Sequence, residues 1–269
     1  MMRMKLNGLL FNIPFVNNVL FYDTIDSTNN KAKELAKRGS VHGSLVVAKS
    51  QTAGKGRLGR SFASMSDDGL YFSVMLRPEV SPEHLSGLTL VAALAVSKAI
   101  QNICGITPSI KWPNDIYVNN KKVVGILTEA GTDYVVIGIG INVNTKSFDK
   151  SIEATATSIY LETGTNVAKE ELLMEILSQL NDLYDTFVVS KDLSFLVEDY
   201  NQGLGSLNKE VFIIPQQLTL TSPNPSLIDT SALEAVLCLG IDKDGNLVCK
   251  DSKEELHYVN SGEVSLRTK

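Results

Sequence analysis

The pattern of apolar and polar positions predicts an irregular mixture of strands and helices in the first two thirds of the chain. A short strand is predicted at residues 19–22, followed by a helix whose N-cap is Ser27 and which stops at Gly39. A Ser-Pro pair at residues 81–82 opens a long helix whose leucine and alanine positions follow the helical repeat. A second long helix is predicted at residues 173–187. Both long helices need a partner surface for their apolar faces.

The other apolar runs of this region predict a sheet. Strands are expected at residues 45–48, 70–76, 116–118, 123–127 and 134–142. The pair Asn119-Asn120 separates two of them and indicates a hairpin. The last run contains valine, isoleucine and glycine with little polar alternation, which is typical of a strand in the middle of its sheet. Strands with helices interspersed irregularly favour an α+β domain over a doubly wound sheet.

After about residue 208 the sequence pattern changes to short apolar runs separated by turn residues. Short strands are predicted at residues 211–214, 235–241, 247–249 and 256–259, with Asp244-Gly245 as a turn signal. We therefore predict a main domain over residues 1–206 and a small all-β domain over residues 207–269.

Composition and charge are those of an acidic globular protein. The 269 residues carry a formal net charge of −5, with 43% hydrophobic residues, so a generic attraction to nucleic-acid phosphate is not expected. The three cysteines and three histidines lack the spacing of a disulfide framework or a zinc site. We expect no membrane-spanning stretch, and polar residues with Pro14 interrupt the first apolar run, which disfavours a signal peptide. A cytoplasmic protein without membrane or nucleic-acid partners is predicted.

The most informative segment runs from Gln51 to Arg60. Three cations alternate with three glycines in residues 54–60, within an acidic protein. Glycines let a loop adopt positive φ angles and bring backbone N–H groups close to an anion. Lysine and arginine side chains add charge-assisted hydrogen bonds. The segment therefore predicts a loop that folds over a phosphate-bearing ligand.

The loop has three other interpretations besides a phosphate-binding loop. Gly54, Gly56 and Gly59 match the spacing of a dinucleotide-binding loop, but residues 61–68 are polar and too short for the crossover helix that such a loop requires. A Walker A loop would end in Gly-Lys-Ser/Thr, which this segment lacks. A flexible solvated loop or a minor basic patch stays open when the loop is considered alone.

A second segment strengthens the ligand-binding interpretation. Lys-Trp-Pro-Asn-Asp at residues 111–115 precedes the predicted hairpin, and Lys122 follows its turn. Each residue has an ordinary structural explanation: core packing for the tryptophan and proline, turn formation for the asparagine and aspartate, solvent exposure for the lysine. The combination is far more specific than its parts.

Together these segments resemble the biotin protein ligase family. The matching blocks are Gly-Lys-Gly-Arg-Leu-Gly-Arg at residues 54–60, Lys-Trp-Pro-Asn-Asp at 111–115, Lys-Val-Val-Gly-Ile-Leu at 122–127 and Gly-Ile-Gly-Ile-Asn at 138–142, with weaker blocks at 26–29, 240–245 and 262–267. They span nearly the whole chain in the expected order. The resemblance implies a mixed β-sheet catalytic domain with flanking helices, similar to class II synthetases, and a small C-terminal SH3-like β-barrel.

The resemblance further implies an AMP-forming ligase. Such an enzyme activates biotin with ATP and Mg²⁺ to biotinyl-5′-AMP and passes the biotin to a lysine of a biotin carboxyl carrier protein; no metal ligands are assigned in the chain. The electrostatics agree, because a carboxylate and a triphosphate repel each other and need cations that neutralise both. A loop that orders over the mixed anhydride would protect it from water.

The resemblance assigns three groups of site residues. The biotin-binding residues are Ser27, Thr28, Asn29, Gln51, Lys55, Arg57, Trp112, Lys122, Gly125 and Leu127. The nucleotide-binding residues are Gly54, Arg57, Arg60, Phe62, Lys111, Asn114, Gly138, Gly140 and Asn142. The catalytic residues are Lys122, Arg57 and Asp115, the last as a group that orients the target lysine or a magnesium ion. Neutral hydroxyl and amide groups suit a ureido ring, although helix capping is an alternative role for Ser27 and Asn29.

The chain departs from the family pattern in two places. Lys55 stands where the family often has arginine, which removes bidentate geometry, and Phe62 stands where a tryptophan often packs on the adenine. Only about twenty residues precede the first predicted strand, too few for the helix-turn-helix domain that some family members carry, so a ligase without operator binding is predicted. A homodimer joined through the main sheet stays open.

Two other functions are alternatives. A lipoate or octanoate ligase has a related catalytic fold, although the polar residues at 27–29 and Gln51 suit a ureido ring better than a dithiolane. A non-catalytic nucleic-acid or adaptor protein could use residues 54–60 as a basic patch. The acidic composition and the absence of aromatic residues within that loop weigh against it.

Overall fold

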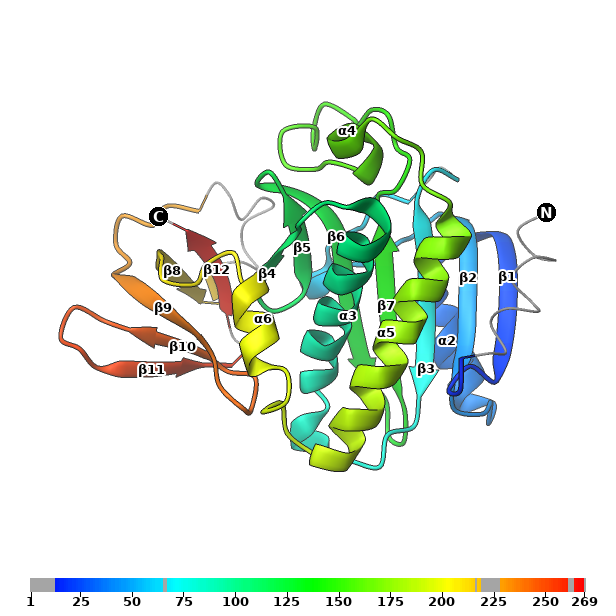
Figure 1. Ribbon diagram of the computed structural model, residues 1–269, viewed down its shortest axis with the longest axis horizontal. Helices are drawn as coiled ribbons and strands as arrows, with labels where there is room; N and C mark the ends of the chain where they lie inside the picture. Colours follow the sequence, from blue (N-terminus) through cyan, green and yellow to red (C-terminus); the bar gives the residue numbers. More distant parts are fainter. Residues whose placement is uncertain (1–12, 65–66, 216, 219–227, 261–263, 269) are drawn as a thin grey trace.

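The fold is built on one seven-stranded sheet. The computed structural model describes residues 13–64, 67–215, 217–218, 228–260 and 264–268. The strands of the sheet are β1 (Asn18–Ile25), β2 (Ser44–Gln51), β3 (Leu70–Leu76), β4 (Ser109–Lys111), β5 (Asp115–Val118), β6 (Lys121–Ala130) and β7 (Val135–Ile141). Their order is β1-β2-β3-β7-β6-β5-β4, and neighbouring strands are antiparallel except β1 and β2 (Figure 1). The predicted mixed α+β class is therefore confirmed.

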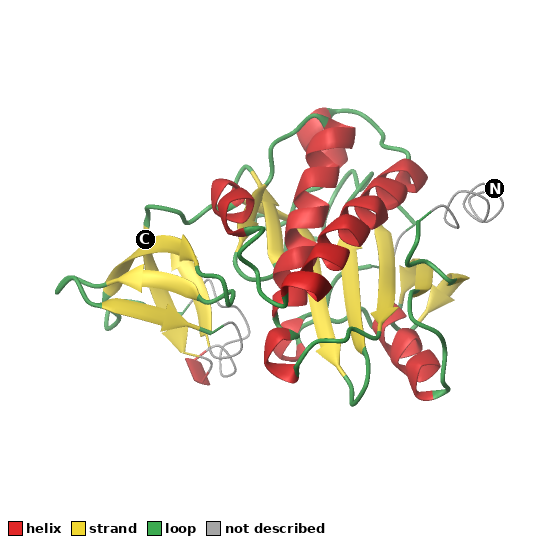
Figure 2. Ribbon diagram, turned by 60° about the horizontal axis from the view of Figure 1, so that its bottom comes forward, coloured by secondary structure: helices red, strands yellow, loops and turns green. Residues whose placement is uncertain are grey.

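Helices cover both faces of this sheet. The two long helices, α3 (Gly87–Cys104) and α5 (Lys169–Ser190), pack side by side on one face (Figures 1 and 2). Helix α2 (Thr28–Lys37) packs on the other face. The alternation of side chains along β2 serves both layers, because Val47 belongs to the large core under α3 and α5 whereas Val46 packs with α2.

Short helical segments connect the larger elements. They are η1 (Arg57–Gly59), η2 (Pro82–His84), α4 (Ile159–Thr163) and α6 (Val197–Gly203). None of the four was predicted as a separate element, because a single helical turn has too few residues for a periodic apolar pattern.

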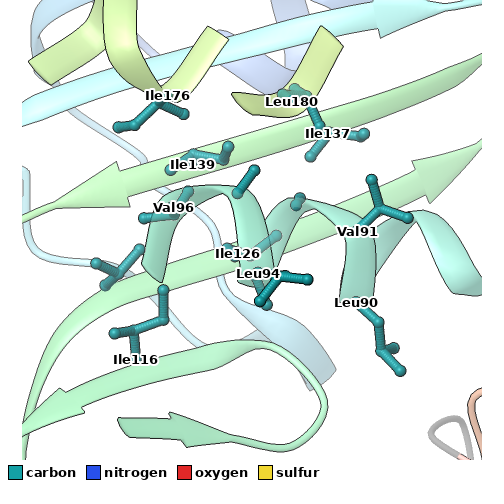
Figure 3. Close-up of a cluster of buried hydrophobic side chains, with 14 of the residues drawn as sticks. Leu90, Val91, Leu94, Val96, Ile116, Ile126, Ile137, Ile139, Ile176 and Leu180 are labelled. Atoms are coloured by element: carbon teal, nitrogen blue, oxygen red, sulfur yellow. The ribbon is translucent and has the colours of Figure 1, made fainter. Parts of the chain in front are cut away.

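The large core lies between the sheet and the two long helices. Figure 3 shows side chains of α3, α5 and the sheet meeting there: Leu90, Val91, Leu94, Val96, Ile116, Ile126, Ile137, Ile139, Ile176 and Leu180. The segment Pro82–Cys104 is long and apolar enough to cross a membrane by length and composition, contrary to the expectation from sequence. However, 67% of its apolar window is buried inside the protein, as in a core helix.

Two local predictions on the sheet are confirmed. Strand β7 lies in the middle of the seven strands, as its valine, isoleucine and glycine content predicts. Asn119 and Asn120 join β5 to β6 with φ angles of 48° and 61°, the positive values of a two-residue hairpin turn.

The C-terminal region forms a second, smaller sheet. Its strands are β8 (Glu210–Pro215), β9 (Ala235–Ile241), β10 (Leu247–Lys250), β11 (Leu256–Val259) and β12 (Val264–Thr268). They are antiparallel in the order β11-β10-β9-β8-β12 and curve into a half-barrel (Figure 2). This agrees with the predicted small β-barrel; strand β12 was missed at the sequence level.

Candidate active site

A pocket opens where helix α2 begins, on the sheet face that carries this helix. The space between its walls is about 310 Å³, its open mouth included. It is lined by Ser27, Thr28, Asn29, Gln51, Lys55, Phe62, Gly125, Leu127, Gly138, Ile139 and Gly140. Apart from Ile139, each of these was assigned to the site from the sequence. The fold therefore brings together four segments that lie far apart in the chain.

The first turn of α2 is capped by a side chain from another strand. The backbone N–H of Thr28 donates to Gln51 Oε1 at 2.8 Å, and Thr28 Oγ1 donates to the same oxygen at 3.2 Å. Gln51 Nε2 in turn donates to Ser64 Oγ at 3.2 Å. One N–H of the Gln51 amide remains for a ligand.

Ser27 occupies the N-cap position, as predicted, but its hydroxyl caps nothing. The residue is 1% exposed and its side chain makes no capping hydrogen bond. Its hydroxyl has no partner among the residues that the structure describes, yet Ser27 lines the pocket. Because this hydroxyl can both donate and accept a hydrogen bond, it is available to a ligand in the pocket.

Ser73, Glu129 and Lys33 support the pocket from behind and were missed in the sequence. Ser73 Oγ lies 2.6 Å from Asn29 Oδ1 and 2.8 Å from Thr28 Oγ1. Glu129 accepts from Asn29 Nδ2 at 2.8 Å and from Lys33 Nζ at 2.6 Å. The sequence offered one hint: Ser73 is the only serine in the apolar strand Leu70–Leu76, where its neighbours are Phe72 and Val74.

Two glycines of β7 leave room for the groups above them. A Cβ atom at Gly138 would lie 1.9 Å from Asn29 Oδ1, and one at Gly140 would lie 2.7 Å from the Phe62 ring. Any side chain at these positions would therefore displace the pocket wall. This explains the glycines in a strand that is otherwise valine and isoleucine.

The glycine- and arginine-rich loop folds into a small hairpin beside the pocket. The N–H of Phe62 donates to the oxygen of Gly54 at 3.0 Å, and the N–H of Gly56 donates to the oxygen of Arg60 at 2.7 Å. At its tip Leu58 has a φ of 56°, which is unfavourable for a residue with a side chain. The loop is thus closed by backbone bonds and bent by a strained residue.

Two cations of the site are tied to each other through the Asn-Asp pair. Arg57 Nη1 donates to Asn114 Oδ1 at 3.0 Å, and Asn114 Nδ2 donates to Asp115 Oδ1 at 3.1 Å. Lys122 Nζ lies 2.7 Å from Asp115 Oδ1 and 5.8 Å from the centre of the Phe62 ring. Burial lowers the pKa of Arg57, which the charge of Asp115 partly offsets. Lys122 therefore lies next to the ring that lines the pocket, and Arg57 is linked to it through Asn114 and Asp115.

Nine assigned residues lie outside the pocket lining: Gly54, Arg57, Asn114, Asp115 and Lys122, described above, and Arg60, Lys111, Trp112 and Asn142. Asn142 is buried and donates to the oxygen of Thr157 at 3.0 Å, whereas Arg60 is exposed. Lys111 lies 5.2 Å from the centre of the Tyr117 ring. Trp112 lies in the large core.

Trp112, which the resemblance assigned to biotin, does not line the pocket. It is 2% exposed within the large core, and its indole N–H donates to the oxygen of Gly245 at 3.2 Å. The side chain therefore packs beneath the sheet and joins the main sheet to the turn between β9 and β10. Its assignment to biotin rests on the resemblance alone and stays a prediction.

Comparison with known proteins identifies the family. The model of the biotin/lipoate A/B protein ligase family matches residues 21–142. A solved structure of a biotin protein ligase from Aquifex aeolicus in complex with biotin and ATP is 30% identical, with a TM-score of 0.79, and the match covers 94% of this chain and 100% of that chain. The chain belongs to the biotin protein ligase family.

Other members of the biotin protein ligase family match part of their own length. The bifunctional ligase/repressor BirA of Bacillus spizizenii is 38% identical over 198 residues, which are 70% of this chain and 61% of that protein. A biotin–[acetyl-CoA-carboxylase] ligase of Paracoccus denitrificans is 38% identical over 158 residues, which are 55% of this chain and 65% of that protein. The chain thus spans less than two thirds of these curated relatives.

Proposed function

We propose that the protein is a biotin protein ligase. It activates biotin with ATP to biotinyl-5′-AMP, releases pyrophosphate, and transfers the biotin to a lysine of a biotin carboxyl carrier protein. The observation that carries this proposal is a pocket with hydroxyl and amide groups and Lys55 in its lining, beside Lys122, to which Arg57 is linked through Asn114 and Asp115. The related Aquifex aeolicus ligase, which holds biotin and ATP, supports the same assignment.

The neutral part of the pocket suits the ureido ring of biotin. Ser27 has a hydroxyl without a partner, and Gln51 has an amide N–H to spare. A ureido group is uncharged and carries both donors and acceptors, so it can satisfy these groups without the cost of burying a charge. Leu127 and Gly125 line the same pocket and leave an apolar path for the acyl chain.

The charged part suits the reacting carboxylate and phosphate. An oxygen of the biotin carboxylate attacks the α-phosphorus of ATP, a new phosphorus–oxygen bond forms, and the bond to pyrophosphate breaks. Lys122 and Arg57 neutralise the negative charge that accumulates on both partners. The amine of the carrier lysine then attacks the acyl carbon, and AMP leaves. Asp115 orients that amine and takes up its proton in this scheme.

The nucleotide is assigned to the glycine-rich loop and the central strands. Arg60 and the backbone at Gly54 face the phosphates, and Phe62 packs on the adenine. Gly138 and Gly140 leave room for the nucleotide because they have no side chains. Lys111, Asn114 and Asn142 complete the assigned set. Closure of the loop would exclude water from the mixed anhydride.

Magnesium is proposed to enter with ATP. Within the described ranges, no group of three or more histidine, cysteine, aspartate or glutamate residues could hold a metal ion. Asp115, the carboxylate beside the two cations, already forms an ion pair with Lys122. These residues do not form a resident metal site, so the ion is part of the nucleotide substrate and no step is assigned to it.

The proposal divides the chain into a catalytic part, residues 1–206, and a small β part, residues 207–269. The turn between β9 and β10 contacts the catalytic part twice: Trp112 Nε1 donates to the Gly245 oxygen, and the Leu193 N–H donates to the Lys243 oxygen at 2.8 Å. The β part thereby supports the segment that carries Asn114 and Asp115. A homodimer joined through the main sheet stays open, and the absence of operator binding stays a prediction.

ATP–pyrophosphate exchange tests the first half-reaction. We expect exchange that depends on biotin and is not supported by lipoate or octanoate. Incubation with a biotin carboxyl carrier domain should then label one lysine, and its Lys→Arg variant should stay unlabelled. Exchange with lipoate but not biotin would support the ligase chemistry but show that the substrate is lipoate. No exchange with any of the three acids would contradict the proposal.

A further inference from the structure

Most of the hydrogen-bonding capacity of the Asn29 amide is occupied by other groups of the protein. Its Nδ2 donates to Glu129 Oε2 at 2.8 Å and to the backbone oxygen of Leu127 at 3.2 Å. Its Oδ1 lies 2.6 Å from Ser73 Oγ. Both N–H groups therefore have partners, whereas the oxygen retains capacity for one more hydrogen bond. Because Asn29 lines the pocket, that capacity is available to a ligand.

Glu129 and the backbone oxygen of Leu127, which both only accept here, together decide which end of this amide faces which way. An ionised carboxylate only accepts hydrogen bonds, so the atom of Asn29 that faces it must be the nitrogen. Burial raises the pKa of Glu129, but hydrogen bonds from Lys33 and Asn29 outweigh this effect and leave the pKa lowered. Lys33 Nζ lies 2.6 Å from the other carboxylate oxygen. Lys33 and Glu129 both lie outside the pocket lining.

We propose that the ion pair of Lys33 and Glu129 sets substrate specificity by fixing Asn29 as a hydrogen-bond acceptor for a ring N–H of the bound acid. The inference rests on the proposed function, because the ureido ring of biotin supplies such N–H groups. A dithiolane ring has none, so a fixed acceptor at this wall favours the ureido ring. Glu129 is thus a positioning residue that acts through Asn29.

Replacing Glu129 by glutamine is the sharpest way to disturb this arrangement. The variant keeps the shape of the side chain but adds an N–H donor. Lys33 attracts the new amide oxygen, so the new amide nitrogen faces Asn29 and favours the flipped amide. A flipped Asn29 would present an N–H group to the ligand in place of its oxygen.

The test compares biotin with its two cyclic carbamate analogues, in each of which one ring N–H is replaced by oxygen. Dissociation constants are measured by calorimetry for the wild-type protein and for Glu129→Gln, Lys33→Met and Glu34→Gln. The last is a matched control, since Glu34 is a carboxylate of α2 that pairs with Lys31 and Arg38. In the wild type, one of the two carbamates should bind about tenfold more weakly than biotin.

In Glu129→Gln this ratio should fall to about threefold or less, because only the Leu127 oxygen then still favours the present orientation and the flipped Asn29 does not require an N–H. The ratio for Lys33→Met should lie between those of the wild type and Glu129→Gln, and the ratio for Glu34→Gln should equal that of the wild type. A general loss of folding would weaken both ligands and leave the ratio unchanged. Equal ratios in the wild type and Glu129→Gln would contradict this inference alone. A wild-type protein that does not bind biotin would contradict the proposed function itself.

Discussion

The two ends of the candidate site are built in different ways. The neutral end, formed by Ser27, Thr28, Asn29, Gln51 and Ser73, is at most 6% exposed, and a chain of side-chain hydrogen bonds joins all of these residues except Ser27. The charged end, formed by Arg57, Asp115 and Lys122, is more open: the side chains of the last two are 21% and 31% exposed.

This difference separates recognition from chemistry. Buried neutral groups hold one fixed pattern of donors and acceptors, because each misplaced group would stay unsatisfied. Partly exposed cations can exchange their present partners for a substrate at small cost, since exposed ion pairs contribute little to stability. Substitutions at the neutral end should therefore affect biotin affinity, and some also stability, whereas those at the charged end should affect rate.

Lys122→Met should have the largest effect and only on chemistry. Loss of a cation that neutralises the reacting groups is expected to slow adenylate formation about 100- to 1000-fold, by analogy with removal of an oxyanion donor. The free energy of unfolding should change by less than about 1 kcal/mol, because the pair with Asp115 is partly exposed. Single-turnover kinetics and urea unfolding measure the two quantities.

Lys121→Met is the matched control for that experiment. Lys121 precedes Lys122 in the same strand and donates to the oxygen of Glu153 instead. It should react at the wild-type rate. A large loss of stability in Lys122→Met with a normal rate would show that the charged end is structural.

Gly138→Ala should damage the neutral end in both affinity and stability. The new Cβ would lie 1.9 Å from Asn29 Oδ1, so the amide must move out of its network. We expect a loss of about 1–3 kcal/mol in unfolding free energy and at least about tenfold weaker biotin binding. Gly203→Ala serves as a control, because its Cβ would meet only ordinary contacts at 3.4 Å and beyond.

Ser27→Ala should separate affinity from stability within the neutral end. Its hydroxyl makes no capping bond, so unfolding free energy should change by less than about 0.5 kcal/mol, while biotin binding weakens about tenfold. At the N-cap of α4, Ser158 accepts from the Leu161 N–H at 3.1 Å, and Ser158→Ala should cost about 1 kcal/mol of stability. Equal stability losses at the two positions would contradict the assignment of Ser27 to the ligand.

The smallest effect is expected from pH at Glu129. Its pKa is lowered in the folded state from an ordinary value of 4.5, so its contribution to stability is present above that value and is lost as pH falls through the lowered one. Glu129→Gln should therefore cost about 1 kcal/mol of unfolding free energy near neutral pH and almost nothing in strong acid. A cost that is constant across this range would contradict the ionised state of Glu129.

The sequence predicts the parts of this molecule that are encoded locally. The middle position of β7 follows from its apolar content, and the Asn119-Asn120 hairpin follows from residues that tolerate positive φ. The residues that line the pocket were found through family blocks, not through periodicity. Those blocks name residues but not the side of the sheet on which each lies, so they do not show that Trp112 is buried in the core.

Long-range polar contacts could not be predicted from the sequence. Glu129 meets Asn29 across 100 positions of the chain, and Ser73 meets Asn29 across 44. Neither residue has a local pattern, because one polar residue in a strand is ordinary. Similarly, the sequence placed Ser27 at the N-cap correctly but could not show that Gln51, from β2, accepts from the first turn instead.

Mass spectrometry of the protein mixed with biotin, ATP and Mg²⁺ tests the central claim most directly, that a neutral pocket selects biotin and the adjacent cations activate it. The account predicts bound biotinyl-5′-AMP in the wild type, its presence in Lys121→Met, and its loss in Lys122→Met although biotin still binds. Formation of the adenylate at the wild-type rate in Lys122→Met, or of lipoyl-adenylate in place of biotinyl-adenylate in the wild type, would contradict it.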